Sequence, residues 1–152
     1  MRVGRPVKAL PRPLCDYCGA PAVLTRAGEE GYPYREDHGP VWVCSPCQAW
    51  IGVMARSTRH VPLGRLADAA LREAKSRLHE VLEPLVARKV RRDGVNAFEA
   101  RSKALRWVST ELGFDPPPPT IHAFSLDQCQ HAIRYVETFL ANRRSTAGSD
   151  DA

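Results

Sequence analysis

Four of the five cysteines stand in two pairs whose spacing suits a metal ion. The pairs are Cys15/Cys18 and Cys44/Cys47, each of the form Cys-x2-Cys, with 25 residues between them. Two such pairs can supply the four thiolates of a tetrahedral Zn²⁺ site. Because four sulfur ligands leave no position for water, the zinc is expected to be structural rather than catalytic. An iron–sulfur cluster and chance pairing are the alternatives, although the clustered spacing of an iron–sulfur motif is missing.

Short β-branched runs lie where strands are needed to present the two pairs. Residues 21–25 and 41–43 are such runs, and Gly19 follows the first pair, where a tight turn can aim backbone amides at the sulfurs. A ribbon of about 40 residues buries too little apolar surface to fold alone. We therefore expect it to depend on its zinc.

Beyond the cysteines, the hydrophobic period changes from two toward 3.6 residues, which indicates helices. Proline removes an amide donor, so Pro84 is expected to kink the first helix or to restart it. Gly94 is expected to end this helix. The three helices are predicted over residues 64–91, 96–112 and 125–142.

Helix starts are marked by capping residues. Asn96 followed by Glu99, and Ser125 followed by Gln128, have the spacing of an N-terminal cap and a capping box. The four prolines at 116–119 cannot be helical and separate the last two helices.

These elements predict an α+β protein, in which a small N-terminal zinc ribbon of short antiparallel strands packs on a bundle of about three helices. The expected parts are a flexible basic arm at 1–14, the zinc ribbon at 15–54, a helical region at 55–142 and a disordered tail at 143–152.

Composition places the 152-residue chain among ordinary globular proteins, with 43% hydrophobic and 26% charged residues. No apolar run is long enough for a membrane span. The N-terminus lacks the apolar core of a secretory signal, so the cytoplasm is the expected location. The formal charge of +5 falls to about +3 when four thiolates bind one Zn²⁺.

Two groups of basic residues could contact the phosphates of DNA or RNA. One combines the arm with residues after the second cysteine pair, and the other lies near the end of the first predicted helix. The candidates are Arg2, Arg5, Lys8, Arg12, Arg56, Arg59, Arg88, Lys89, Arg91 and Arg92. Both groups have an alternative explanation, since basic termini are often only solvated and cations at a helix C-terminus are stabilised by the helix dipole.

The sequence offers little for catalysis. Asp37-His38 between the cysteine pairs resembles the Asp-His strand of His-Asn-His nucleases, but the few residues before Cys44 cannot hold the rest of that module. No catalytic residue is assigned, and no role is given to His38, His60 or His122. A metal-dependent nuclease is therefore the least favoured hypothesis, and Cys129 on an apolar stripe is expected to be a core residue.

Several motifs together resemble a family of small bacterial and phage proteins that contain a zinc-finger domain. The similar segments are Cys15 to Ala22, Val43 to Val53, Pro62 to Ala67, Leu71-Arg72, His79, Glu83-Pro84-Leu85, Arg101, Ala104, Trp107-Val108, Leu112-Gly113, Phe124 and Cys129. The chain departs from the family pattern at Met54, where histidine is common, and around 120–124. The resemblance implies a zinc ribbon with a helical extension in a bacterial or phage cytosol, and it implies no reaction.

The resulting prediction is a non-enzymatic zinc module that binds nucleic acid. The alternative is a protein-interaction module acting on host machinery, because the remaining charge is small. The oligomeric state is left open.

Overall fold

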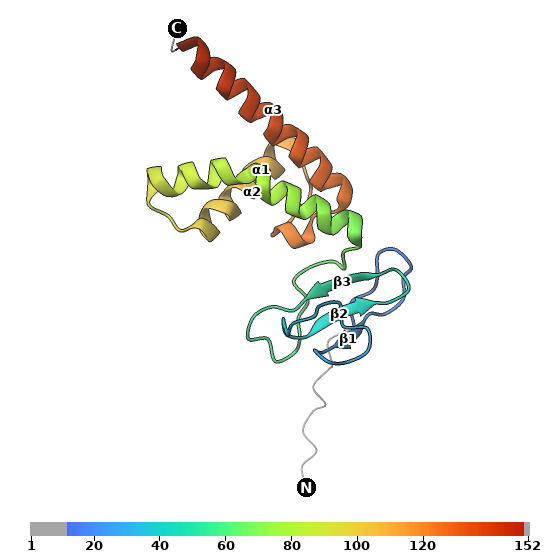
Figure 1. Ribbon diagram of the computed structural model, residues 1–152. Coiled ribbons are helices and arrows are strands. Elements are labelled where there is room, and N and C mark those ends of the chain that lie inside the picture. The colour runs from blue at the N-terminus through green and yellow to red at the C-terminus, as the bar shows by residue number, and fades with distance from the viewer. Residues whose placement is uncertain (1–11, 151–152) are drawn as a thin grey trace. The chain divides into compact units, whose positions relative to one another are not determined.

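The computed structural model describes residues 12–150, with side chains for residues 12–144, and the chain divides into two compact units after Ala69. The first unit holds the strands and the four paired cysteines, and the second holds three helices (Figure 1). The predicted α+β class is confirmed. The candidates Arg2, Arg5 and Lys8 lie outside the described residues, as does most of the predicted arm.

The first unit, described over residues 12–69 and here called the zinc unit, contains one antiparallel sheet in the order β1-β2-β3. Its strands are β1 (Val23–Thr25), β2 (Val41–Cys44) and β3 (Ala49–Gly52). The predicted strands at 21–25 and 41–43 correspond to β1 and β2, whereas β3 was not predicted. In β3, Ala49 and Ile51 are buried and Trp50 is half-exposed, which is the alternation of a strand with one covered face.

The chain after β3 turns back and runs beside it. Val53 bridges to Pro62 and Trp50 bridges to Ala67, with backbone hydrogen bonds in both directions between Trp50 and Ala67. Residues 64–68, predicted as the start of a helix, therefore belong to the zinc unit. The prediction was wrong because the spacing of Leu66 fits a helix, while its backbone is held beside β3 and its side chain is fully buried there.

The helical unit consists of α1 (Ala69–Asp93), α2 (Ala97–Leu112), a short 3-10 turn η1 (Ile121–Ala123) and α3 (Leu126–Asp150). Pro84 lies within α1, which runs as one continuous helix from Ala69 to Asp93, so of the two expected effects, a kink or a restart, the restart does not occur. The Pro84 side chain is exposed, and the carbonyl that loses its amide partner is that of exposed Glu80, where water can replace the bond.

Both predicted helix starts are confirmed by their caps. The Asn96 side chain accepts the Glu99 N–H at 2.8 Å. Ser125 and Gln128 form a reciprocal capping box, with bonds of 2.9 and 3.1 Å. The helix α3 continues beyond residue 142 to Asp150, into the stretch predicted to be disordered.

The core of the helical unit is formed by the apolar stripes of the three helices together with the segment before α3. Phe124 is fully buried and meets Phe114 edge to face, with the ring centroids 6.0 Å apart. Cys129 is also fully buried, as predicted. Within the described part of the chain, none of the helices has the length and apolar character needed to cross a bilayer.

Candidate metal centre and basic pocket

The first cysteine pair sits in a tight loop before β1. The Cys15 N–H donates to the Ala20 carbonyl at 2.9 Å, and the Gly19 N–H donates to the Cys15 carbonyl at 2.8 Å. Gly19 has a φ of +78°, a left-handed conformation that residues with a Cβ adopt at a cost. The loop thus directs Cys15 and Cys18 to the same side.

The second pair forms the turn that joins β2 to β3. Cys44 is the last residue of β2 and pairs with Ala49 at the start of β3. Gln48, which follows the second cysteine as Gly19 does in the first loop, has a φ of +49° and donates its N–H to the Ser45 carbonyl at 3.2 Å. In both loops, therefore, the residue directly after the second cysteine is left-handed, although only the first loop uses glycine there.

The four sulfurs converge on one point. All four Sγ atoms lie within 4.8 Å of one another, and those of Cys18 and Cys44 are 3.6 Å apart. A tetrahedral zinc with Zn–S bonds of about 2.3 Å has sulfurs about 3.8 Å apart, so the arrangement fits the ion. The cysteines are not disulfide-bonded. The four predicted ligands are thus brought together, and a zinc ion held here is structural, since four thiolates fill its coordination.

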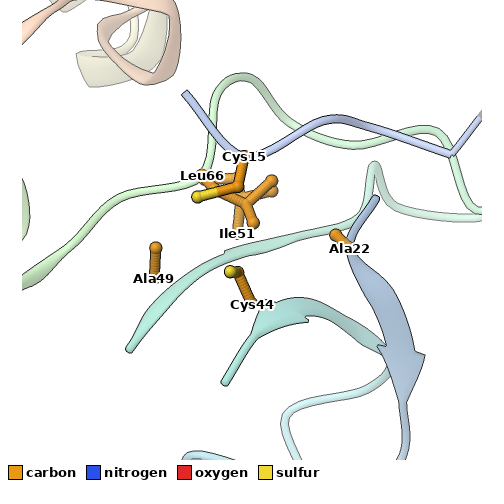
Figure 2. Close-up of a cluster of buried hydrophobic side chains, with 6 residues drawn as sticks. All are labelled: Cys15, Ala22, Cys44, Ala49, Ile51 and Leu66. Atoms are coloured by element: carbon orange, nitrogen blue, oxygen red, sulfur yellow. The ribbon is translucent and has the colours of Figure 1, made fainter. Parts of the chain in front are cut away.

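The metal centre adjoins a small apolar cluster (Figure 2). Cys15 and Cys44 are buried in it, while Cys18 is exposed and Cys47 is half-buried. The other members are Ala22, Ala49, Ile51 and Leu66. Ala49 and Ile51 belong to β3, while Ala22 precedes β1 in the chain and Leu66 follows β3. Only two of these four side chains are larger than alanine, so this cluster contributes little stability and the metal must supply much of it.

The thiols alter one another's titration. The backbone N–H of Ala20 donates to the Cys18 sulfur and, together with the neighbouring thiols, lowers the pKa of Cys18. A hydrogen bond to Cys18, and then burial, raises the pKa of Cys47 to about 12. The Cys47 amide acts to lower the pKa of Cys44, but burial and the Cys18 and Cys15 thiols outweigh it and the pKa is raised. Binding of zinc to four thiolates therefore releases protons, and acid opposes it.

Gly19→Ala is expected to weaken zinc binding about tenfold. No atom lies within 4 Å of the added Cβ, so the cost arises from the positive φ alone, at about 1 to 2 kcal/mol. Competition with a chromophoric chelator measures the affinity. Gln48→Gly is the matched control, because it places a glycine at the equivalent left-handed position and should not weaken binding. Equal zinc affinity in Gly19→Ala and the wild type would contradict the role given to the left-handed conformation of Gly19 in the metal loop.

The three histidines considered above, His38, His60 and His122, each contact other side chains of the protein. The carbonyl of His60 accepts the Trp42 Nε1–H at 2.8 Å, and His38 lies edge to face against Tyr34 at 4.7 Å. His122 lies 3.4 Å from the Lys75 ammonium, and burial together with that charge lowers the pKa of His122. Among the residues with described side chains, the four cysteines are the one group of three or more potential ligands close enough to share a metal ion.

The basic candidates of the zinc unit are exposed. Arg56 and Arg59 lie in the loop between β3 and the returning chain, and Arg12 stands at the start of the described residues. No shared site of these three residues emerges from the structure in the part of the chain that it describes.

The basic candidates of the helical unit are brought together more closely. A cavity of about 380 Å³, here called the basic pocket, is lined by five cations from three helices. Arg88, Lys89 and Arg92 were predicted from α1, whereas Arg91 does not line the pocket. The pocket adds Lys103 from α2 and Arg143 from α3, which sequence reasoning missed. The helical period places Lys103 one turn before Trp107, but Arg143 fell in the predicted tail and gave no signal.

The part of the basic pocket's lining that is not charged is apolar. It includes Leu85, Ala104, Trp107 and Phe139. The Trp107 ring meets the Phe139 ring at 4.8 Å between centroids and the Tyr135 ring at 5.5 Å.

A family model described as a zinc-finger-containing domain matches residues 12–139, which include the four cysteines, the sheet and most of the helical unit. No curated protein and no solved structure is significantly similar to the chain.

Proposed function

The chain belongs to the zinc-finger-containing domain family, and from this premise we propose that it is a zinc-stabilised module that binds nucleic acid through phosphate contacts. The observation that carries the proposal is the basic pocket, where cations from α1, α2 and α3 surround one cavity.

The ion pairs around the pocket leave part of this charge available. Lys89 and Arg92 both pair with Asp93, at 2.7 and 3.0 Å, and Lys103 lies 3.5 Å from Glu99. Within the described residues, neither Arg88 nor Arg143 has a carboxylate partner. The lining contains five cations and no acid, so its net effect on a phosphate is attraction.

The distribution of charge favours the helical unit over the ribbon as the phosphate-binding surface. Residues 12–69 contain six arginines and six carboxylates, and four thiolates with one Zn²⁺ add about −2. The described ribbon is therefore neutral to acidic. Residues 70–144 instead contain thirteen basic residues and nine carboxylates, and five of the basic residues line the basic pocket.

Replacement of Arg88 by alanine is expected to weaken binding several-fold and to reduce the slope of log affinity against log salt by about 0.7 to 0.9, since one phosphate contact is lost. Fluorescence anisotropy with labelled single strands and duplexes, at roughly 50 and 200 mM salt, measures both quantities.

The matched control is Arg91→Ala, which removes the same charge from the same helix end outside the pocket. Arg91 lies in the last turn of α1, where the helix dipole acts, and Arg88 lies before that turn, so the dipole cannot account for a larger loss of binding in Arg88→Ala. Equal losses in the two variants would count against the pocket as the site. Absence of any binding at low salt, by protein shown to hold its zinc, would end the nucleic-acid proposal.

A protein-interaction role of the zinc unit is the second candidate. Its balanced charge does not attract phosphate, and several apolar side chains are exposed, with Leu14 at 60%, Val23 at 57% and Met54 at 50%. Exposed apolar side chains are the usual material of a protein interface. Affinity capture by zinc-loaded wild type that fails with a Val23→Asp variant would favour this candidate.

A further inference from the structure

The basic pocket has two chemically different parts. Arg88 and Arg143 provide unpaired positive charge on its lining, while Ala104, Trp107 and Phe139 provide an apolar and aromatic surface. A free phosphate would need only the charges. A ligand that uses the whole pocket must carry an anionic group next to a flat, apolar one.

The aromatic part is held rigidly. Trp107 is fixed edge to face between Phe139 and Tyr135, with interplanar angles of 68° and 61°. The guanidinium carbon of Arg143 lies 5.7 Å from the centre of the Phe139 ring, within cation–π range. Ring surface and cation are therefore already adjacent before a ligand arrives.

The dimensions suit one nucleotide. A cavity of about 380 Å³ lies at the lower end of the range for pockets that enclose small organic ligands. In an intact duplex the bases are stacked, and a pocket of this kind could reach only backbone phosphates. In a single strand a base can leave its stack and lie on an aromatic side chain.

From these features, and resting on the proposed function, we infer that the basic pocket accepts one unpaired base of a single-stranded nucleic acid, with the neighbouring phosphates on its cations. The protein then binds single strands in preference to intact duplexes. DNA and RNA share this chemistry, so matched strands of both are included in the test.

Filling the pocket without changing its charge provides the test. Ala104 is half-buried on α2, and leucine there projects into the cavity while remaining a good helix former. We expect Ala104→Leu to weaken binding of a labelled single strand about tenfold, the size of one lost stacking contact, and to weaken duplex binding much less, because the cations of the pocket are kept. Ala97→Leu is the matched control, since it lies on the same helix and does not line the pocket. Circular dichroism confirms that both variants are folded.

A second variant keeps an aromatic ring at position 107 and removes the tryptophan fluorescence from the pocket. Trp107→Phe should bind the single strand within about twofold of the wild type but should lose the change in tryptophan emission caused by a stacked base. An emission change that persists in Trp107→Phe would overturn the inference, because it would arise from Trp42 or Trp50 in the zinc unit.

The outcomes separate the two proposals. Preference for single strands that Ala104→Leu abolishes supports the inference. Equal binding of single strands and duplexes, with no effect of Ala104→Leu, overturns it while the proposed function stands. Failure to bind any strand at low salt overturns both.

Discussion

Removal of zinc is expected to unfold the zinc unit and to leave the three helices folded. The apolar cluster of the zinc unit contains only six buried residues, and two of them are the ligands Cys15 and Cys44. Without zinc, nothing bonds the two cysteine loops to each other, although their four sulfurs lie within 4.8 Å of one another. Structural zinc contributes about 10 to 16 kcal/mol of apparent binding free energy in small zinc domains, more than such a cluster can replace.

Limited proteolysis and circular dichroism during titration with a strong chelator measure this effect. Cleavage should appear within residues 12–69, while the helical signal persists, because the helices form a compact unit of their own. Cys44→Ser should produce the same pattern without chelator. Cys129→Ala is the control, since the fifth cysteine lies in the helical core and its loss should leave one zinc per chain. Full protection of the zinc unit after zinc is removed would contradict a structural role for the metal.

The second large effect is expected at Phe124. Its side chain is fully buried before α3 and packs against Phe114, so Phe124→Ala leaves a cavity in the helical unit. Truncation of a buried phenylalanine costs about 3 to 5 kcal/mol, a large part of the total stability of a small domain. Urea denaturation followed by circular dichroism should show the loss.

The control for this variant is Phe98→Ala, because Phe98 on α2 is 79% exposed and its removal leaves no cavity. Zinc content should stay at one per chain in both variants, since neither residue belongs to the zinc unit. A similar loss of stability in the two variants would show that the packing at Phe124 is not as described.

The sequence predicted well wherever a structure depends on a few neighbouring residues. Each Cys-x2-Cys loop is closed by hydrogen bonds within its own segment, so spacing alone identified Cys15, Cys18, Cys44 and Cys47. The starts of α2 and α3 were found for the same reason, because a cap and its partner lie three residues apart.

The start of α1 shows where local reasoning fails. The apolar spacing at Leu66 fits a helix, but Ala67 exchanges backbone hydrogen bonds with Trp50, 17 residues earlier. That pairing also identifies β3, which is too short to stand out in the sequence. A strand of four residues is stabilised by its neighbours, and those neighbours lie elsewhere in the chain.

By itself, then, the sequence determined the metal ligands, the α+β class and the caps of two helices, since each is encoded within a few consecutive residues. Only the tertiary structure decided that Arg88 lines a pocket and Arg91 does not, and that Lys103 and Arg143 join it from other helices. The physical reason is that the packing of α1, α2 and α3 fixes which cations converge on Trp107, and this packing depends on contacts between residues far apart in the chain.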